Sequence, residues 1–359
     1  MTTATATERA ALLEVTRDFA RHELAPHSAA LDAGDPGALT DRWRRLTEIG
    51  LDRALLAEEL GGSGLGILDL LPAIEELAYG DGGFAMCVLL CNAALASLAP
   101  EQAAAIPAYE RWVLVPVRSE TEVRISDGAL RGHVASALGA HGADRLVLAV
   151  AGGAQPATVD LAADTPGLTL EREEEQMGLR GAPAASITLT GVEYPFGATG
   201  SNGDGGGGSE PASALTLLRA GTASIARGIA RRAYEMALDY AHERRQGGVA
   251  IIEHDAVSDM LGAMAVRLTS PAPAAAGAAQ ALAAKIAETE AAVASTNDAV
   301  QVFGGTGYMC ETGIEKLMRD AKYCQLFPEP NWVAQDELIR LRVLDAVWRP
   351  SGRVPRSST

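Results

Sequence analysis

The first hundred residues carry apolar side chains at the spacing of helices. Leu12, Val15 and Phe19 lie three and four residues apart, and the pattern continues to Pro26, whose ring cannot extend a helix. The next helices are expected over residues 41–49 and 68–79. This pattern predicts an N-terminal helical domain over residues 1–109.

The pattern changes near residue 110, where short runs rich in valine, leucine and isoleucine alternate with Gly, Pro and Asp. Runs of this kind predict strands joined by turns. The expected strands cover residues 113–117, 145–150, 158–161, 168–171 and 186–189. We therefore expect a small middle β-domain over residues 110–197.

Helical periodicity returns after a glycine-dense segment, for which we predict a flexible connection over residues 198–213. The helices expected beyond it cover residues 215–246, 253–269, 278–303 and 311–324. They predict a C-terminal four-helix bundle over residues 214–350, followed by a disordered tail over residues 351–359. Helices, then strands, then a bundle make an α+β fold.

The overall charge limits the classes of partner. The chain has 359 residues and a net charge of −16, so we expect no binding to nucleic acid, which needs clustered Lys and Arg. A local arginine cluster can still bind an anion. The sequence shows neither a secretion signal nor about 18 consecutive apolar residues, so we expect a cytoplasmic protein without a membrane span.

The four cysteines predict no metal centre, because they form no CxxC pair and no zinc set with the six scattered histidines. Cys87 and Cys91 lie four residues apart on an expected helix. A weak metal pair is one interpretation of this spacing. Two small apolar side chains facing the core are the other.

Residues 301–325, QVFGGTGYMCETGIEKLMRDAKYCQ, form the most informative segment. Gly304, Gly305 and Gly307 follow an apolar helical run, and glycines lack the Cβ that would keep an anion away from the backbone amides. The same glycines could instead end a helix and form a turn. Further on, Arg319, Asp320 and Lys322 are interpreted as the exposed, salt-linked face of a helix.

This segment resembles the C-terminal signature of the acyl-CoA dehydrogenase family of flavoproteins. Other matches to the family are the turn and helix at EELGGSGLG and EELA, the segment MGLRG in the middle domain, and ERRQGG. These matches lie at residues 58–66, 75–78, 177–181 and 243–248. The resemblance implies the family's fold with a shortened middle β-domain, FAD as cofactor, and a homodimer or homotetramer in which each site uses two chains.

The resemblance also implies which residues bind the cofactor. A guanidinium in the ERRQGG segment suits the FAD pyrophosphate, because arginine is always charged and can bind bidentately. The implied cofactor residues are Arg244, Gln246, Gln301, Gly304, Gly305 and Gly307. Gly247 stands where the family has phenylalanine. The alternative for ERR is a charged helix end stabilised by the helix dipole.

The sequence departs from the family at the catalytic base. Relatives carry a glutamate three residues after the Gln of RDAKxxQ, where this chain has Pro328, and Glu329 follows one place later. Glu329 is the candidate base, and an exposed loop carboxylate is the alternative. Some relatives keep the glutamate on the first bundle helix, in a position that is Leu218 here. Arg219 matches an arginine near the substrate end of the pocket.

The middle domain also lacks family features. Residues 115–120 run almost directly into residues 127–132, which removes the threonine and serine that meet the flavin ring in relatives. Residues 135–140 stand where a Trp-Ile-Thr strand is expected. Trp332 follows the candidate base and is interpreted as a core tryptophan, with packing over a ligand as the alternative.

The resemblance therefore leads to three functional hypotheses. The first is FAD-dependent α,β-desaturation of an acyl thioester on CoA or on an acyl-carrier protein, in a biosynthetic pathway, with electron-transfer flavoprotein or oxygen as acceptor. The second is a flavin-dependent oxygenase on the same scaffold, which needs no α-proton base. The third is a flavin-free relative whose active site is lost or repurposed.

Overall fold

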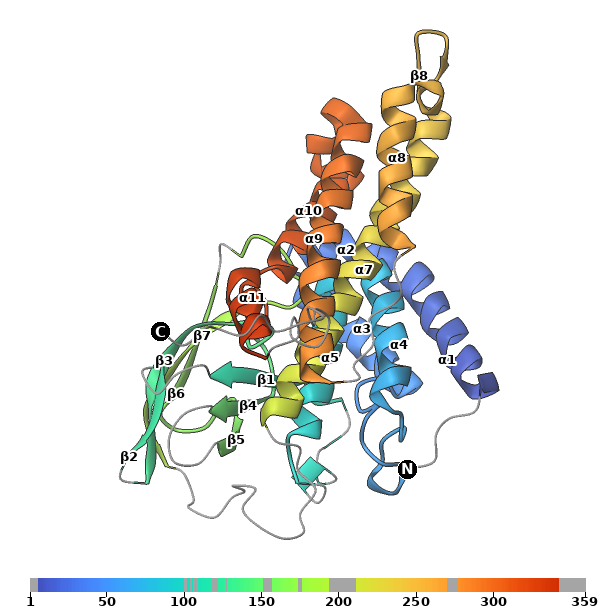
Figure 1. Cartoon of the computed structure of the whole chain (residues 1–359). Coiled ribbons are helices and arrows are strands. Elements are labelled where there is room, and N and C mark those ends of the chain that lie inside the picture. Colours follow the sequence, from blue (N-terminus) through green and yellow to red (C-terminus); the bar gives the residue numbers. More distant parts are fainter. Residues whose placement is uncertain are drawn as a thin grey trace, which may run out of the picture.

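The computed structural model describes residues 6–99, 102–103, 105, 107, 109–117, 122–126, 128–150, 157–173, 176–193, 211–269 and 277–341. It has helices at both ends of the chain and sheets between them (Figure 1), which confirms the α+β prediction. Most of the expected glycine-rich connection and all of the expected tail lie outside the described residues. The first bundle helix already begins at Pro211.

The N-terminal part is helical, as its apolar periodicity indicates. Its elements are α1 (Ala6–Phe19), a π-helical turn (Ala20–Leu24), a 3-10 turn (Ala25–His27), α2 (Ser28–Asp32), α3 (Pro36–Ile49), a 3-10 turn (Glu58–Leu60), α4 (Ile67–Gly80) and α5 (Gly82–Ala96). Almost every residue of α5 is buried, so this helix is apolar on all sides and lies in the centre of the core. A Cβ on Gly83 would meet the backbone of Gly181 at 2.6 Å, which shows how closely the middle domain approaches α5.

The middle part contains two sheets. One has the order β1 (Trp112–Val117), β4 (Arg145–Val150) and β5 (Ala157–Ala162), with β1 parallel to β4. The other is antiparallel, with the order β2 (Val123–Ser126), β3 (Ala129–Ala137), β7 (Ala185–Glu193) and β6 (Leu168–Arg172). The β2–β3 hairpin falls in the region interpreted from sequence as a deleted loop, and β3 includes the first residues of the altered Trp-Ile-Thr strand.

The C-terminal part is a bundle whose longest helices project beyond the rest of the molecule (Figure 1). Its elements are α7 (Pro211–Glu243), a hairpin of β8 (Arg245–Gln246) and β9 (Val249–Ala250), a 3-10 turn (Ile251–Glu253), α8 (Asp255–Leu268), α9 (Ala278–Phe303), 3-10 turns (Gly304–Tyr308 and Cys310–Thr312), α10 (Ile314–Cys324) and α11 (Asn331–Arg340). The hairpin and the C-terminal end of α9 both lie at the projecting end, far from the sheets. The sequence did not predict α11, whose short run of mixed polar and apolar residues shows no clear periodicity.

Ion pairs join α4 to the bundle. The EELA segment supplies Glu75 and Glu76, and the α7 side chain Arg231 lies 2.9 Å from Glu75 and 2.6 Å from Glu76. Arg227 lies 3.5 Å from Glu75 and 3.6 Å from Glu288 of α9. Burial raises the pKa of Glu75, although both arginines oppose this shift. The matched EELA segment thus carries a structural contact between two helical units.

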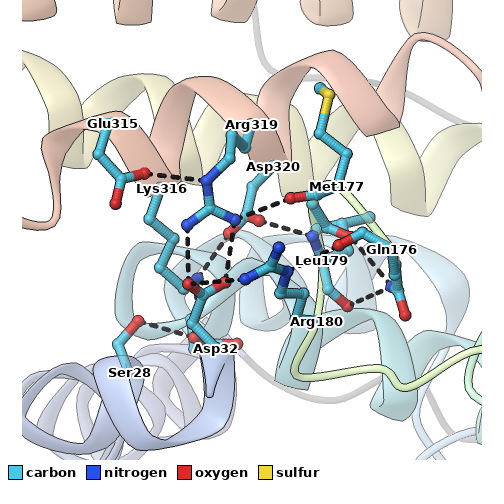
Figure 2. A network of polar contacts seen from close by, with 12 residues as sticks. Ser28, Asp32, Gln176, Met177, Leu179, Arg180, Glu315, Lys316, Arg319 and Asp320 are labelled. Carbon is cyan, nitrogen blue, oxygen red and sulfur yellow. Dashed lines mark hydrogen bonds and ion pairs between the residues drawn. The ribbon is translucent and has the colours of Figure 1, made fainter. Parts of the chain in front are cut away.

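A buried lysine of α10 connects all three parts of the chain. Lys316 Nζ lies 2.6 Å from Asp320 and 3.0 Å from Asp81, which precedes α5, and both aspartates are fully buried. Burial opposes the charge of Lys316, but the two carboxylates outweigh it and raise the pKa of the lysine. The Asp320 carboxylate also accepts a 2.6 Å hydrogen bond from the backbone N–H of Leu179 in the middle domain (Figure 2).

This contact explains an unusual backbone conformation and corrects one interpretation. Leu179 has a φ of 53°, which is unfavourable for a branched residue and is held here by the bond to Asp320. Next to it, Arg319 lies 2.7 Å from Asp32, which ends α2 (Figure 2). The interpretation of Asp320 as part of an exposed face is therefore wrong, because its side chain faces the junction of the three parts.

The two cysteines of α5 are apolar side chains of the core. Cys87 and Cys91 are both buried, and burial raises the pKa of Cys91 to about 12. No three His, Cys, Asp or Glu side chains of the described residues form a possible metal centre. None of the helices described here combines the length and the apolarity that crossing a bilayer requires.

We expect the substitution Lys316→Met to destabilise the protein by about 3–5 kcal/mol, because it leaves two buried carboxylates without their cation. Urea unfolding followed by circular dichroism measures the change. The control is Lys322→Met on the same helix, where the exposed lysine contacts only the Gln325 amide in the described chain. Its effect should stay within about 0.5 kcal/mol. Equal effects of the two substitutions would contradict the role of Lys316.

Candidate active site

The hairpin at the projecting end of the bundle carries two of the implied cofactor residues. The helix α7 ends at Glu243, and Arg244 and Gln246 follow it with exposed side chains. Gly247 and Gly248 have φ angles of 66° and 93°, so they form the two-residue turn that closes a tight hairpin. This turn gives a physical reason for glycine at position 247, where relatives have phenylalanine.

The three glycines after α9 have three different environments. Gly304 has a φ of 61° and a ψ of −137°, a conformation that glycine alone adopts easily. A Cβ on Gly307 would meet the carbonyl oxygen of Val300 at 2.6 Å, so this glycine is needed for packing. Gly305 has neither constraint, because its φ is not positive and a Cβ there would meet no atom of the described chain within 4 Å. Fold requirements within one chain thus do not explain glycine at position 305.

The structure brings the hairpin end of α7 and the glycine turn together. The ring of Tyr240, four residues before Arg244, stacks on Phe303 with the ring centroids 4.3 Å apart. The Tyr240 hydroxyl lies 3.4 Å from that of Thr306. Gln301 is exposed on the last turn of α9, so the implied cofactor residues Arg244, Gln246, Gln301, Gly304, Gly305 and Gly307 lie at one end of the bundle.

Large apolar side chains are exposed at the same end. Tyr308 is 84% exposed and Met309 is 53% exposed, directly after the glycine turn. Exposed apolar side chains that gather next to candidate binding residues are typical of an interaction surface. The exposed guanidinium of Arg244 and the side-chain amides of Gln246 and Gln301 at the same end can bind an anionic group such as a pyrophosphate.

The candidate base and the candidate substrate residue lie elsewhere, inside the body of the bundle. Arg219 Nε donates a 3.0 Å hydrogen bond to Glu329 Oε1, and the two nitrogens at the end of the guanidinium bind the carboxylate of Glu337. Arg219 is 3% exposed and Glu329 6% exposed. Burial opposes the charge of Arg219, but the two carboxylates prevail and raise its pKa.

A second buried cation shapes the turn that carries Glu329. The α9 side chain Lys285 donates hydrogen bonds of 2.6 Å to the carbonyl of Glu329 and 2.7 Å to Oδ1 of Asn331. The turn is closed by the N–H of Asn331, which donates to the carbonyl of Gln325 at 2.9 Å. These bonds fix the backbone on both sides of Glu329 and turn its side chain inward. The interpretation of Glu329 as an exposed loop carboxylate is therefore wrong.

Sequence reasoning missed three members of this cluster, which are Lys285, Asn331 and Glu337. Lys285 offered a signal in the sequence, because it is a single lysine in the alanine-rich run ALAAKIA. In the structure this lysine is fully buried. A buried lysine needs partners. Asn331 and Glu337 gave no signal in the sequence, because they lie beyond the last segment that resembles the family.

The structure also shows where two other residues near this cluster lie, Trp332 and Leu218. Trp332 is 66% exposed, so the interpretation as a core tryptophan is wrong. It is the second residue of α11, whose buried residues are Asn331 and Ala334. Leu218 is fully buried, next to Arg219 in the sequence. Residues 118–121, next to the expected deletion in the middle domain, lie outside the described residues.

The altered strand of the middle domain does contact the bundle. Ser136, in the last part of β3, donates a 2.6 Å hydrogen bond to Glu173 and lies near Tyr323 of α10. Burial raises the pKa of Tyr323, and the Ser136 hydroxyl partly offsets this shift. Arg219 and Glu329 line neither of two cavities of about 350 and 420 Å³ in the described chain.

Comparisons with known proteins find matches over both helical parts of the chain. The family model "Acyl-CoA dehydrogenase, N-terminal domain" matches residues 6–104, and "Acyl-CoA dehydrogenase, C-terminal domain" matches residues 205–328. A protein of Bacillus subtilis, named as the probable acyl-CoA dehydrogenase YngJ, is 28% identical over 89% of this chain and 93% of its own length.

Solved structures show the same fold. Butyryl-CoA dehydrogenase from Megasphaera elsdenii has a TM-score of 0.80 and 22% identity, over 96% of this chain and all of that chain. An acyl-CoA dehydrogenase from Bacillus anthracis complexed with FAD has a TM-score of 0.82 and 19% identity, over 96% of this chain and 67% of that chain. The chain belongs to the acyl-CoA dehydrogenase family.

Proposed function

We propose that this protein is an FAD-dependent dehydrogenase of acyl thioesters, carried on CoA or on an acyl-carrier protein, with Glu329 as its base. The observation that carries the proposal is the inward orientation of Glu329, whose backbone is held by Lys285 and whose carboxylate is held by Arg219. A base must be held firmly within reach of the proton that it removes. Both bonds supply this fixation although Pro328 occupies the usual position of the glutamate.

The chain's own residues have distinct roles in the proposed reaction. Glu329 removes the proton from the α-carbon, while Arg219 positions one carboxylate oxygen of Glu329. When bound, FAD would supply the acceptor for the hydride that leaves the β-carbon. Arg219 was expected to bind substrate, but two carboxylates already occupy its guanidinium. We therefore propose that it contributes to substrate binding only through Glu329.

The proposal also assigns FAD binding to residues at the projecting end of the bundle. Arg244, Gln246 and Gln301, with the amide of Gly305, would hold the pyrophosphate and neighbouring groups of an FAD bound to a partner subunit. The fit rests on a permanent cation, two amide side chains and a glycine whose Cβ position is open. A homodimer or homotetramer follows from this arrangement.

One observation favours a second candidate, a flavin-dependent oxygenase on the same fold. The Glu329 carboxylate is bound to the same guanidinium as Glu337 instead of lining either of the two cavities. An oxygenase reaction needs no base for the α-proton, so it tolerates this pairing. Rapid oxygen consumption by the reduced protein in the presence of an acyl thioester would favour this second candidate.

We expect Glu329→Gln to slow flavin reduction by about 10²- to 10⁴-fold, the usual contribution of a general base. Anaerobic stopped-flow absorbance with butyryl-CoA as the probe measures this rate, and the flavin content shows that the site is intact. The control is Glu337→Gln, which changes the other carboxylate on Arg219 and leaves the base in place. An unchanged rate in Glu329→Gln would exclude Glu329 as the base.

We expect Gly304→Ala to lower the stability of the protein and Gly305→Ala to weaken its binding of FAD. Gly304→Ala should cost about 1–3 kcal/mol of stability, because alanine is strained in that conformation. Gly305→Ala should leave the stability of the flavin-free chain within about 0.5 kcal/mol, yet weaken FAD binding. Urea unfolding and the ratio of FAD to protein measure the two effects. Normal FAD binding by Gly305→Ala would exclude the proposed approach of the cofactor.

We expect the purified protein to show flavin absorbance and to be a dimer or larger by light scattering. Tyr308→Asp should produce monomers that lose FAD, because it places a charge in the exposed apolar end of the bundle. The control is Leu68→Asp, which changes a side chain of α4 that is 64% exposed. A colourless wild-type protein with the same fold would support the flavin-free hypothesis instead.

A further inference from the structure

A cavity of about 420 Å³ lies where the N-terminal helix α2 meets the bundle helices α7 and α10. Its volume falls within the range of small-molecule binding sites. Ser28, Arg180 and Lys316, which surround the buried ion cluster in Figure 2, form part of its wall. None of the residues that we assign to catalysis or to FAD binding lines this cavity.

Six charged side chains line the cavity, and four of them already have partners. Asp32 and Glu315 both bind Arg319, at 2.7 and 2.9 Å. Lys316 belongs to the buried ion cluster of α10. Arg180 donates to a backbone carbonyl at 2.7 Å and lies 4.0 Å from Asp32. The charge that a ligand can use therefore comes from the other two side chains.

The first of these is Arg232, a half-buried arginine of α7. It packs on the ring of Tyr79, 5.3 Å from the ring centre, as do Arg21 and Arg231. Arg21 and Arg231 pair with glutamates at 3.4 and 2.6 Å, but Arg232 has no carboxylate partner in the described chain. Burial lowers the pKa of Arg232, so its surroundings do not fully compensate its charge. A carboxylate brought by a ligand would do so.

The second is Glu311, an exposed glutamate of the 3-10 turn before α10. Its carboxylate makes no ion pair within the described chain, so it does not neutralise Arg232. The cavity thus presents two opposite charges that do not contact each other. A simple anion on Arg232 would also face the Glu311 carboxylate. A ligand that carries an ammonium group at its other end meets both charges favourably.

The lining between the charges is small and apolar. It comes from Met236 of α7, Leu317 of α10 and the alanines Ala25, Ala29 and Ala33. We propose that this cavity binds a short zwitterionic amino acid, with its carboxylate on Arg232, its ammonium group on Glu311 and its methylene groups along this lining. Because the walls come from the N-terminal part and from the bundle, the bound amino acid joins the two and stabilises the native state. Neither Glu329 nor FAD takes part in this binding.

Calorimetric titration of the purified full-length protein with β-alanine, 4-aminobutanoate and 6-aminohexanoate tests this site. At least one of the three should bind saturably, with one molecule per chain, and raise the unfolding temperature. The amine of the same chain length lacks the carboxylate and should bind at least about tenfold more weakly. The acid of that length lacks the ammonium group and should bind about threefold more weakly, because Glu311 is exposed. No saturable binding, or equal binding of the amine, would overturn the proposal.

Substitutions locate the bound amino acid. Arg232→Gln should weaken its binding at least about tenfold. The control is Arg44→Gln, at an exposed arginine of α3 that does not line this cavity. Glu311→Gln should weaken binding about threefold, with a smaller effect at high salt. Its matched control is Glu290→Gln, the same change at an exposed glutamate of α9 outside the cavity.

The two glutamate substitutions decide the outcome even if Arg232→Gln fails to fold, since both side chains are exposed. The preference for the amino acid over the acid of the same length should disappear in Glu311→Gln and persist in Glu290→Gln. If the preference persists in both variants or disappears in both, the amino acid binds elsewhere and the proposal is overturned.

Discussion

The ion cluster of Lys316, Asp81 and Asp320 is the contact on which the arrangement of the three parts depends. A single ammonium group joins the helix α10 to the start of α5, and Asp320 extends the contact to the backbone of the middle domain. A buried cluster of this kind requires all its members at once, because any charge left alone is strongly unfavourable. It therefore fixes the orientation of the parts more strictly than apolar packing does, since apolar surfaces tolerate sliding.

This fixed body contrasts with the projecting end of the bundle. The body holds the Arg219–Glu329 pair among buried residues, where Arg219 binds the carboxylate of Glu329 and Lys285 binds its backbone carbonyl. The projecting end instead exposes its polar side chains and two large apolar ones. One chain therefore carries a buried internal cluster and an exposed external surface. The proposed function takes the two from different subunits.

Much of the fold could be predicted from sequence. The periodicity of residues 278–303 gave the helix α9 with both ends correct, because apolar spacing continues until two glycines end it. The strands β2 and β3 were missed since the resemblance suggested a deletion there, although Gly128 at φ 74° makes a normal turn between them. A missing family motif was taken for a missing strand.

The site could be predicted only in part. Motifs led to the glycine turn, where close approach of the backbone depends on residue type alone. The surroundings of Glu329 depend instead on contacts across more than forty residues, such as that with Lys285, and no local pattern encodes them. The same holds for Asp320, which looks like a surface residue in the sequence, although its carboxylate accepts the backbone N–H of Leu179 from another part of the chain.

The shared guanidinium of Arg219 has a consequence for the last described helix. Glu337 lies on α11 and Glu329 lies in the turn before it, so both carboxylates depend on one cation. If α11 moves outward, Glu337 leaves with it, and the whole positive charge of Arg219 then acts on Glu329. The electrostatic surroundings of the candidate base are thus coupled to the docking of a surface helix. Any protein that contacts the exposed side of α11 gains a way to act on the interior.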